Sequence, residues 1–263
     1  MTMLVQVHGC GGSGKTTVAR KLFGLFGGVM TDWYEPEPFD YPTLSKGERG
    51  MFVPKKKDRV MGHRLVRADG LTMDVIGSYT STECGGADKI SPPDLTYELV
   101  KRRAAAGADV VFLEGLLLGK CSPERYVNWP GPLLIVQLNT SPELALRSMN
   151  ERRARAGKEP FEQGDNRSWD NIMNSYNTTM SVARRVAAAG RSVLHLDRDE
   201  APETILRWIL DPVLRGLGNA PFIGQKLETV MYDEVKDSSP SVAQEEERPM
   251  GEPPKFGEQG GLF

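Results

Sequence analysis

The chain has no long apolar run, and this excludes one class of protein at once. Nowhere in its 263 residues does an uninterrupted hydrophobic stretch approach the roughly 20 residues that a membrane-spanning helix requires. A secretory leader is not expected either, because a glycine-rich segment with a lysine begins at Gly9, where the apolar part of a leader would lie. We therefore expect a cytoplasmic protein with no membrane partner.

Cysteine is scarce. The three cysteines, Cys10, Cys84 and Cys121, are odd in number and far apart. A disulfide framework or a structural zinc site needs paired or clustered cysteines, so neither is expected, and a reducing compartment is the natural setting. The sequence contains no indication of the oligomeric state.

Net charge is also small, at −2, but it is unevenly distributed. The segment from Lys46 to Arg67 holds eight basic and two acidic residues, whereas the chain from Lys226 onward holds nine acidic and four basic ones. Without that acidic tail the rest of the chain would carry a charge of about +3, which is compatible with a polyanionic substrate.

What the sequence does contain is a phosphate-binding loop. The pattern Gly-x-x-x-x-Gly-Lys-Ser/Thr is complete between Gly9 and Thr16, with a strand-like apolar pattern before it and a helical pattern after it. In such loops backbone N–H groups point at the phosphates, the lysine reaches the β and γ oxygens, and the hydroxyl coordinates Mg²⁺. We predict that ATP is bound by Gly9, Cys10, Gly11, Gly12, Ser13, Gly14, Lys15, Thr16 and Thr17.

Strand and helix patterns alternate through residues 1–217, which predicts an α/β fold with a parallel sheet and helices on both faces. With the phosphate loop, this indicates a P-loop NTPase similar to nucleoside and nucleotide kinases, with a lid. Residues 46–67 have few periodic apolar positions, so we expect a basic insertion or long loop there. Residues 218–263 are rich in Ser, Pro, Glu and Gly and are expected to form a disordered tail.

A carboxylate at the end of a buried strand is the second candidate for the metal site. The run "DVVFLEG" places Glu114 where phosphate-loop proteins hold Mg²⁺ or orient the attacking group. A strand-end acid that only caps the next turn is the alternative. Thr16 and Glu114 are the predicted magnesium ligands.

Basic residues gather near the end of a predicted helix, within a lid-like segment at 147–160: Arg147, Arg152, Arg153, Arg155 and Lys158. Arginines on a lid stabilise charge on a transferring phosphoryl group. A solvated helix face is the alternative. Arg152 and Arg153 are the best candidates for the catalytic role.

Transfer to a hydroxyl group also requires a base that accepts its proton, and a carboxylate is expected in that role. Asp32 and Glu35 follow the second predicted strand, at the sheet edge where ligands bind, although Pro36 and Pro38 also allow plain turn chemistry. Which carboxylate acts stays open, and the predicted catalytic set is Lys15, Asp32, Glu35, Asp88, Glu114, Arg152 and Arg153. Aromatic residues that could stack on a base, or simply pack, are Trp33, Tyr34 and Tyr79.

Four segments together resemble the phage-encoded 5-hydroxymethyluracil DNA kinases: "GCGGSGKTT", "TDWYEPE", "IGSYTSTECGGADKI" and "FLEG". The similarity covers Met1 to Leu217, and the Gly-x-Tyr-x₄-Cys-Gly-Gly-x-Asp-x-Ile segment, residues 77–90, is its most specific part. The resemblance implies an ATP- and Mg²⁺-dependent kinase with an alcohol group as acceptor. Its substrate would be the hydroxymethyl group of 5-hydroxymethyluracil within phage DNA, in the host cytoplasm, as a step in thymidine hypermodification that evades restriction.

The residues themselves leave other functions open. A deoxynucleoside monophosphate or nucleoside kinase acting on free nucleotides shares the whole ATP side but does not need the basic segment, where Lys55, Lys56 and Lys57 would contact DNA phosphates. An ATP-hydrolysing switch or motor is less consistent with the lid-like arginines. A third alternative is a DNA-binding module whose nucleotide site is not used. It is weak, because Lys15, Thr16 and Glu114 would then have no function.

Overall fold

The computed structural model describes residues 1–43, 49–54, 59–80, 86–87, 90–115, 125, 127–161 and 166–217. The chain divides into two compact units, Met1–Ile223 and Gly224–Phe263, and the elements below all belong to the first. Some predictions fall outside the described residues. They concern Asp88, the lysine triplet at 55–57, Cys84, Cys121 and the tail at 218–263.

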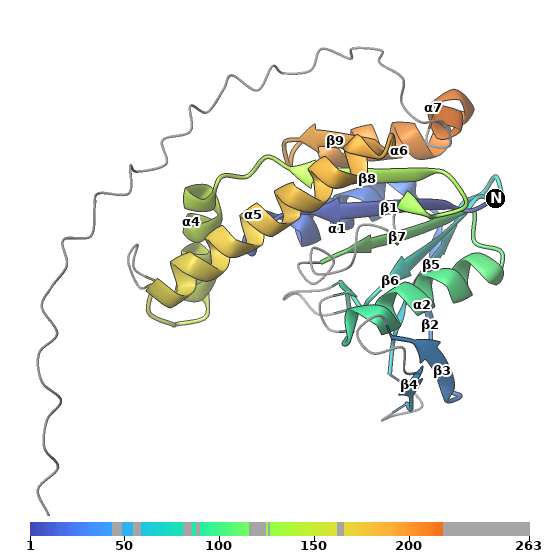
Figure 1. Cartoon of the computed structure of the whole chain (residues 1–263), viewed down its shortest axis with the longest axis horizontal. Helices are drawn as coiled ribbons and strands as arrows, with labels where there is room; N and C mark the ends of the chain where they lie inside the picture. Colours follow the sequence, from blue (N-terminus) through green and yellow to red (C-terminus); the bar gives the residue numbers. More distant parts are fainter. Residues whose placement is uncertain are drawn as a thin grey trace, which may run out of the picture. The chain divides into compact units, whose positions relative to one another are not determined.

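A mostly parallel sheet forms the centre of the first unit (Figure 1). In the described part of the chain its strand order is β2-β5-β6-β7-β1-β8-β9. The strands are β1 (Met3–His8), β2 (Val29–Trp33), β5 (Gly62–Val66), β6 (Thr72–Ile76), β7 (Val110–Glu114), β8 (Leu133–Leu138) and β9 (Ser192–Leu196). Strands β6, β7, β1, β8 and β9 pair in parallel, so their carboxyl ends meet at one edge.

Helices cover both faces of the sheet, as predicted. Alternate residues of β1 point in opposite directions: Met3, Val5 and Val7 pack with α1 (Lys15–Phe26) and α6 (Ala201–Leu210), whereas Leu4 packs in the cluster that includes α2 (Pro93–Ala105) and α5 (Asn166–Ala188). Helix α4 (Pro142–Arg155) lies beside the start of α5. No helix in the described ranges combines the length and the apolar character needed to cross a bilayer.

Short polar signals set the helix ends. The Ser141 hydroxyl accepts a hydrogen bond from the Leu144 amide at 3.3 Å and caps α4, as its sequence indicates. One predicted helix over 201–216 is instead two, because Pro212 has no amide hydrogen to continue α6. Asp211 caps the following helix, α7 (Pro212–Leu217), by accepting from the Val213 amide at 2.8 Å.

The expectation of a loop or insertion over residues 46–67 is wrong for much of its described part. Strand β5 lies there and occupies an internal position in the sheet, antiparallel to both β2 and β6, so the sheet is mixed rather than wholly parallel. Strand β4 (Arg49–Phe52) also lies there and forms an antiparallel hairpin with β3 (Phe39–Pro42). The basic residues concealed the strand pattern, because the carboxylates that pair with them are identified only when the strands are placed.

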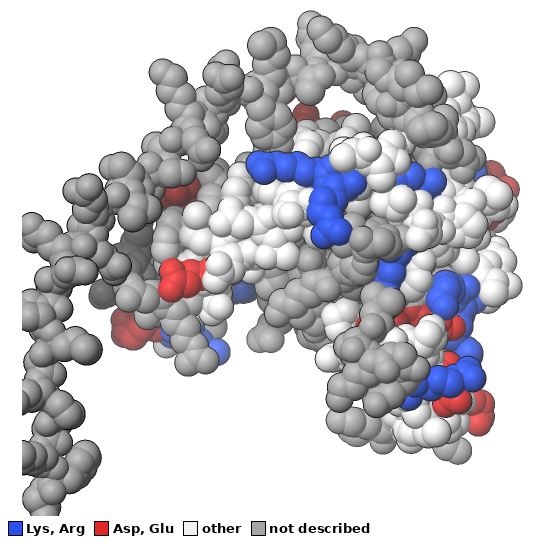
Figure 2. All heavy atoms as spheres, in the orientation of Figure 1, with Lys and Arg blue, Asp and Glu red and all other residues white. Residues whose placement is uncertain are grey.

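Three of the described basic residues in this segment are paired within the protein. Arg64 binds Asp74, Arg67 binds Asp69 at 3.2 Å, and Arg49 lies 3.9 Å from an oxygen of Asp40. Figure 2 shows the same mixture on the surface near α2 and the β3–β4 hairpin, where Lys and Arg side chains are interspersed with Asp and Glu. The local charge of +6 therefore overstates the positive surface that the described residues offer.

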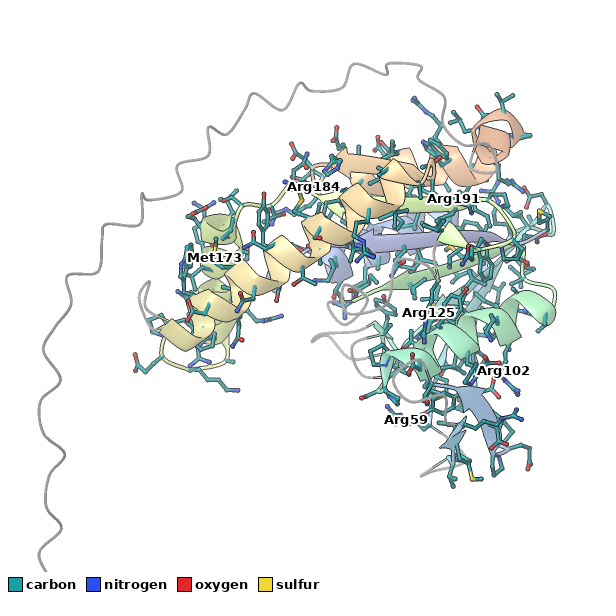
Figure 3. The ribbon with its side chains drawn as sticks, viewed as in Figure 1. Arg59, Arg102, Arg125, Met173, Arg184 and Arg191 are labelled. Atoms are coloured by element: carbon teal, nitrogen blue, oxygen red, sulfur yellow. The ribbon has the colours of Figure 1, made fainter. Side chains whose placement is uncertain are left out.

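The β3–β4 hairpin is attached to α2 through Arg102. Its guanidinium lies 4.1 Å from the centre of the Phe39 ring and donates to Glu35 at 3.0 Å. Figure 3 shows Arg102 on α2, above the hairpin, with Arg59 at the hairpin's other side. A cation over an aromatic face and an ion pair together hold the hairpin in one orientation.

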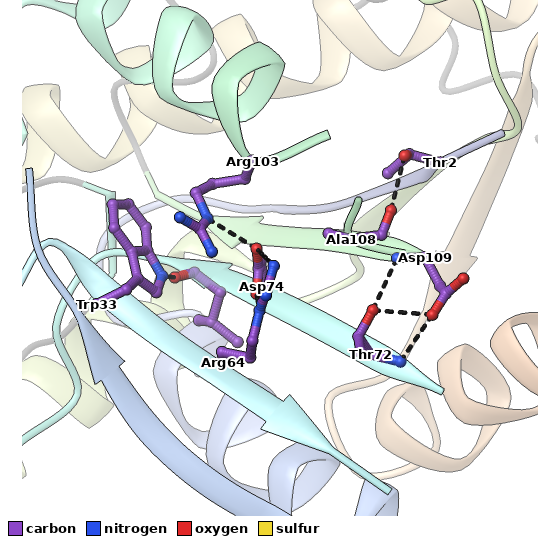
Figure 4. Close-up of polar contacts among 9 residues, drawn as sticks. Thr2, Trp33, Arg64, Thr72, Asp74, Arg103, Ala108 and Asp109 are labelled. Atoms are coloured by element: carbon purple, nitrogen blue, oxygen red, sulfur yellow. Dashed lines mark hydrogen bonds and ion pairs between the residues drawn. The ribbon is translucent and has the colours of Figure 1, made fainter. Parts of the chain in front are cut away.

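A buried carboxylate joins β5, β6 and α2 (Figure 4). Asp74 on β6 is fully buried and accepts from Arg64 on β5 at 2.7 and 2.8 Å and from Arg103 on α2 at 2.7 Å. Arg103 in turn lies over the Trp33 ring, whose indole N–H donates to the Val75 carbonyl at 3.2 Å. This network holds β5 in register beside β6.

Asp74→Asn should destabilise the fold by about 3 kcal/mol, because a neutral amide leaves the two partly buried guanidinium groups of Arg64 and Arg103 without their counter-charge. Urea unfolding followed by circular dichroism measures this change. The matched control is Asp69→Asn, whose side chain is 54% exposed and which should leave the unfolding midpoint nearly unchanged. Equal effects of the two substitutions would contradict a structural role for the buried network.

Candidate active site

The predicted phosphate loop joins the end of β1 to the start of α1, which begins at Lys15. Gly12 has φ of 83°, and a Cβ at this position would lie 2.3 Å from the Ala145 carbonyl oxygen on α4. Only glycine allows that close approach. Gly14 caps α1 without a side-chain hydrogen bond, so the first amide groups of the helix stay available to an anion.

Lys15 points back into the loop. Its side chain is buried, and its ammonium donates to the carbonyl oxygens of Gly9 and Cys10, both at 2.9 Å. An ammonium has three N–H donors, so one remains for a phosphate oxygen. The Ser13 hydroxyl oxygen is buried and has no hydrogen-bond partner among the described residues, which also suits a phosphate. The loop therefore fits a bound triphosphate.

Thr16 and Glu114 lie together, as predicted for a metal site. The Thr16 hydroxyl donates to Glu114 Oε1 at 2.9 Å, and Glu114 is almost fully buried. Within the described ranges, no three His, Cys, Asp or Glu residues are grouped to hold an ion. A hydroxyl and a single carboxylate suit Mg²⁺, which takes its remaining ligands from water and substrate phosphates.

The segment that carries the family resemblance packs against this carboxylate. The Tyr79 hydroxyl donates to Glu114 Oε1 at 3.2 Å. Gly86 has φ of 89°, and a Cβ on it would lie 2.4 Å from the same oxygen. A side chain at position 86 would thus displace Glu114, which gives a physical reason for glycine at this position of the resemblance segment.

His63 is a site residue that the sequence analysis missed. It is fully buried on β5, its Nδ1 lies 2.7 Å from Asp32 Oδ1, and its Nε2 accepts the Tyr79 amide hydrogen at 2.8 Å. A backbone amide only donates, so Nε2 carries no proton, and the ring is neutral with its N–H directed at Asp32. No local pattern identified this histidine, because its burial depends on β5 lying between β2 and β6.

The two described candidates for the base differ in their partners. Asp32 on β2 is 36% exposed and is held by His63. Glu35 is only 9% exposed and forms an ion pair with Arg102, so it has a structural partner in place. The third candidate, Asp88, lies outside the described residues.

The aromatic residues near this edge have separate environments. Trp33 is buried in the core, so the expectation that it could stack on a base is wrong. Tyr79 packs edge-on against Phe23, with ring centres 5.0 Å apart, and its hydroxyl reaches Glu114. Tyr34 is 42% exposed.

Arg152 and Arg153 both lie in the last turn of α4, where positive charge complements the helix dipole. Arg153 folds back on its own segment, since its guanidinium lies 3.9 Å from the centre of the Phe161 ring and its Nε donates to the Glu159 carbonyl. Arg152 and Thr17 are exposed. Contact of either arginine with a phosphoryl group stays a prediction.

Two groups in and beside the loop are kept uncharged. Burial, with a smaller effect of Lys15, lowers the pKa of His8 to about 3. Burial raises the pKa of the Cys10 thiol, which packs with Ala145, Leu146 and Ile172. At neutral pH His8 therefore adds no positive charge that would repel Lys15, and Cys10 offers no thiolate that would compete with the phosphates for Lys15.

The buried His8 should make stability depend on pH. Below its ordinary pKa of 6.5 the unfolded chain binds a proton that the folded protein refuses until about pH 3, so stability is lost as pH falls through this window. The slope is about 1.4 kcal/mol per pH unit. Urea unfolding between pH 7 and pH 4 should show a shallower slope for His8→Gln than for the parent protein. Identical slopes would exclude a buried neutral His8.

Comparison with known proteins adds an independent finding. No protein-family model matches the sequence, and no solved structure matches the chain. The chain is 34% identical over 201 residues to a protein of Pseudomonas phage PaMx11 named "5-hmdU DNA kinase", a match that covers 75% of this chain and 92% of that protein. The resemblance inferred from four sequence segments is confirmed: the chain is a phosphotransferase and belongs to the family of 5-hmdU DNA kinases.

Proposed function

We propose that the protein transfers the γ-phosphate of ATP to the hydroxymethyl group of 5-hydroxymethyluracil within DNA. The observation that carries the proposal is the grouping of Lys15, Thr16 and Glu114 at the carboxyl edge of β1 and β7, in a relative of a 5-hmdU DNA kinase. This grouping supports the proposal of a phosphate donor site beside a magnesium site, on a nucleoside-kinase-like P-loop fold that we assign to residues 1–217.

The donor side follows from the contacts of the loop. The amides of residues 11–17 and the Ser13 hydroxyl would hold the phosphates, and Lys15 would bind the β and γ oxygens. Thr16 and Glu114 would hold Mg²⁺, which when bound neutralises charge on the phosphate oxygens. Arg152, within the proposed lid over residues 147–160, would place positive charge near the transferring group.

Asp32 is the carboxylate that we assign as the base. The hydroxymethyl oxygen forms a bond to the γ-phosphorus, the bond from that phosphorus to the ADP oxygen breaks, and the hydroxyl proton passes to Asp32. His63 orients Asp32 by donating its Nδ1 hydrogen, since its other nitrogen is held by the Tyr79 amide. Glu35 is less suited because Arg102 already binds it.

The biological setting completes the proposal. Phosphorylation converts the hydroxyl into a good leaving group, so a nucleophile can bond to the exocyclic CH2 carbon of the base while the bond from that carbon to the phosphate oxygen breaks and phosphate is released. We place the enzyme in thymidine hypermodification of phage DNA in the host cytoplasm, where the altered bases would resist host restriction.

The central test is incubation with γ-labelled ATP and one of three acceptors: DNA with 5-hydroxymethyluracil, matched DNA with thymine, or the free hydroxymethyl nucleotide. We expect label in the first alone, and a yield that falls as salt rises. Label in the free nucleotide alone would replace this proposal with a nucleotide kinase. Lys15→Met should reduce labelling at least about 10²-fold, whereas the exposed control Lys21→Met should not.

Two substitutions of His63 separate its two hydrogen bonds. Asparagine places an N–H near the position of Nδ1 and can still donate to Asp32, whereas glutamine reaches the Tyr79 amide but leaves Asp32 without a donor. We expect His63→Gln to lower kcat at least about tenfold with little change in the KM for ATP, and His63→Asn to retain more activity. Asp32→Asn should lower kcat about 10²- to 10⁴-fold.

A purely structural role for His63 predicts another outcome. Both substitutions would then lower kcat in proportion to their loss of stability, measured as the urea midpoint, and asparagine would give no rescue.

A further inference from the structure

A cavity of about 400 Å³ lies between the β3–β4 hairpin and the start of α2. Its walls include the rings of Tyr41 and Phe52, the Glu35 side chain and Arg59. This volume is in the range of small-molecule sites, and apolar walls with a few polar groups are their usual composition. None of the roles assigned above to the phosphate loop, the metal ligands or Asp32 uses this cavity.

The chemistry of the walls suits a pyrimidine base. The flat faces of a pyrimidine are apolar and pack against aromatic rings, whereas its edge carries both kinds of hydrogen-bonding group. In uracil the N3–H can donate to a carboxylate such as Glu35, and the carbonyl oxygens can accept from a guanidinium such as Arg59. The cavity thus offers a partner for each face and edge of the base.

The cavity leads toward the candidate active site. A second cavity, of about 280 Å³, shares Arg59 and Ile90 with the first and is also lined by Ser78 and Thr80. These two residues flank Tyr79, whose amide donates to His63 and whose hydroxyl donates to Glu114. Through these shared residues the first cavity adjoins the segment that contacts His63 and Glu114, which is the side that the hydroxymethyl group of a bound base would have to face.

The rim of the cavity carries exposed apolar side chains. Met51 and Val53 both line the cavity and are 67% and 57% exposed. Two contacts hold strand β4, which bears Met51, in place. Gly50 packs directly on the Tyr41 ring, and Arg102 of α2 contacts Phe39 of the hairpin and the nearby Glu35. Apolar side chains on a rigid support are what proteins insert beside a base step to unstack it.

We propose that this cavity receives the pyrimidine extruded from duplex DNA, and that Met51 and Val53 form the wedge that keeps its neighbours apart. The inference rests on the proposed function, since an enzyme acting on a base inside DNA must take that base out of the stack. The proposed substrate is thus a nucleotide flipped out of a DNA duplex. The β3–β4 hairpin would be needed for duplex substrate and less for single-stranded substrate.

The test compares two double variants of the same composition. Met51→Ser with Val53→Ser removes the wedge, and Met30→Ser with Val29→Ser removes a matched pair on β2 that is 53% and 69% exposed and lines neither cavity. KM is measured for a duplex and for a single-stranded oligonucleotide that each contain one 5-hydroxymethyluracil. The wedge variant should raise the KM for the duplex about tenfold and the KM for the single strand by less. The reason is that extruding a base from a duplex costs more free energy than exposing a base in a single strand.

The control pair should leave both KM values unchanged. Arg59→Met, which alters the cavity rather than its rim, should raise the KM for duplex and single strand alike. A fluorescent base analogue opposite or beside the target reports extrusion directly, and its signal on binding should fall in the wedge variant. Urea unfolding confirms that each variant is folded.

The outcomes separate the two levels of the proposal. If the parent protein labels neither DNA, the proposed function fails and this inference with it. If the parent protein labels DNA but the wedge variant behaves like the control pair, or loses duplex and single strand equally, the kinase stands and the flipping hairpin is refuted.

Discussion

The parallel pairing of β1 with β7 is the constraint on which the site depends. Its register sets Val7 opposite Glu114, one residue from the end of β1, and the phosphate loop then returns the chain so that Thr16 meets Glu114 at 2.9 Å. Two oxygen atoms that we propose as metal ligands, from positions 98 residues apart in sequence, are brought together in this way. A slip of one residue in this pairing would turn Glu114 to the other face of the sheet and separate the two proposed ligands.

A second set of contacts connects the acceptor side to this centre. The antiparallel strand β5 carries His63 next to Asp32 of β2 on one side and next to the Tyr79 amide, just beyond β6, on the other. Because the Tyr79 hydroxyl also binds Glu114, the segment after β6 contacts both the histidine that holds the proposed base and the proposed metal ligand. The ion pairs of Asp74 hold β5 in place, so a buried structural network supports the geometry of the site.

The positive charge of the 46–67 segment is distributed differently from what its composition indicates. Arg64 and Arg67 form ion pairs within the protein. Arg59 lines both cavities. In the described part of the protein, the proposed recognition of DNA would therefore depend more on the β3–β4 hairpin and its cavity than on a broad basic surface. Such a balance would suit the proposed selection of a modified base, which needs more than attraction to a polyanion.

The sequence by itself determined the part of the site that would bind the phosphate donor. A phosphate loop is a local motif whose residues are adjacent in the chain, so Lys15 and Thr16 could be assigned from their spacing, and the buried run before Glu114 indicated its place at a strand end. Helix caps such as Ser141 are also local signals, since the capping hydroxyl and the amide that it binds are only three residues apart. Only the tertiary structure decided the part of the site that would bind the phosphate acceptor, because the contacts there join residues that are not neighbours in the sequence. The pairing of His63 with Asp32, the burial of Trp33, and the placing of Arg64 opposite Asp74 depend on β5 entering the sheet, which no local pattern of charge or hydrophobicity revealed.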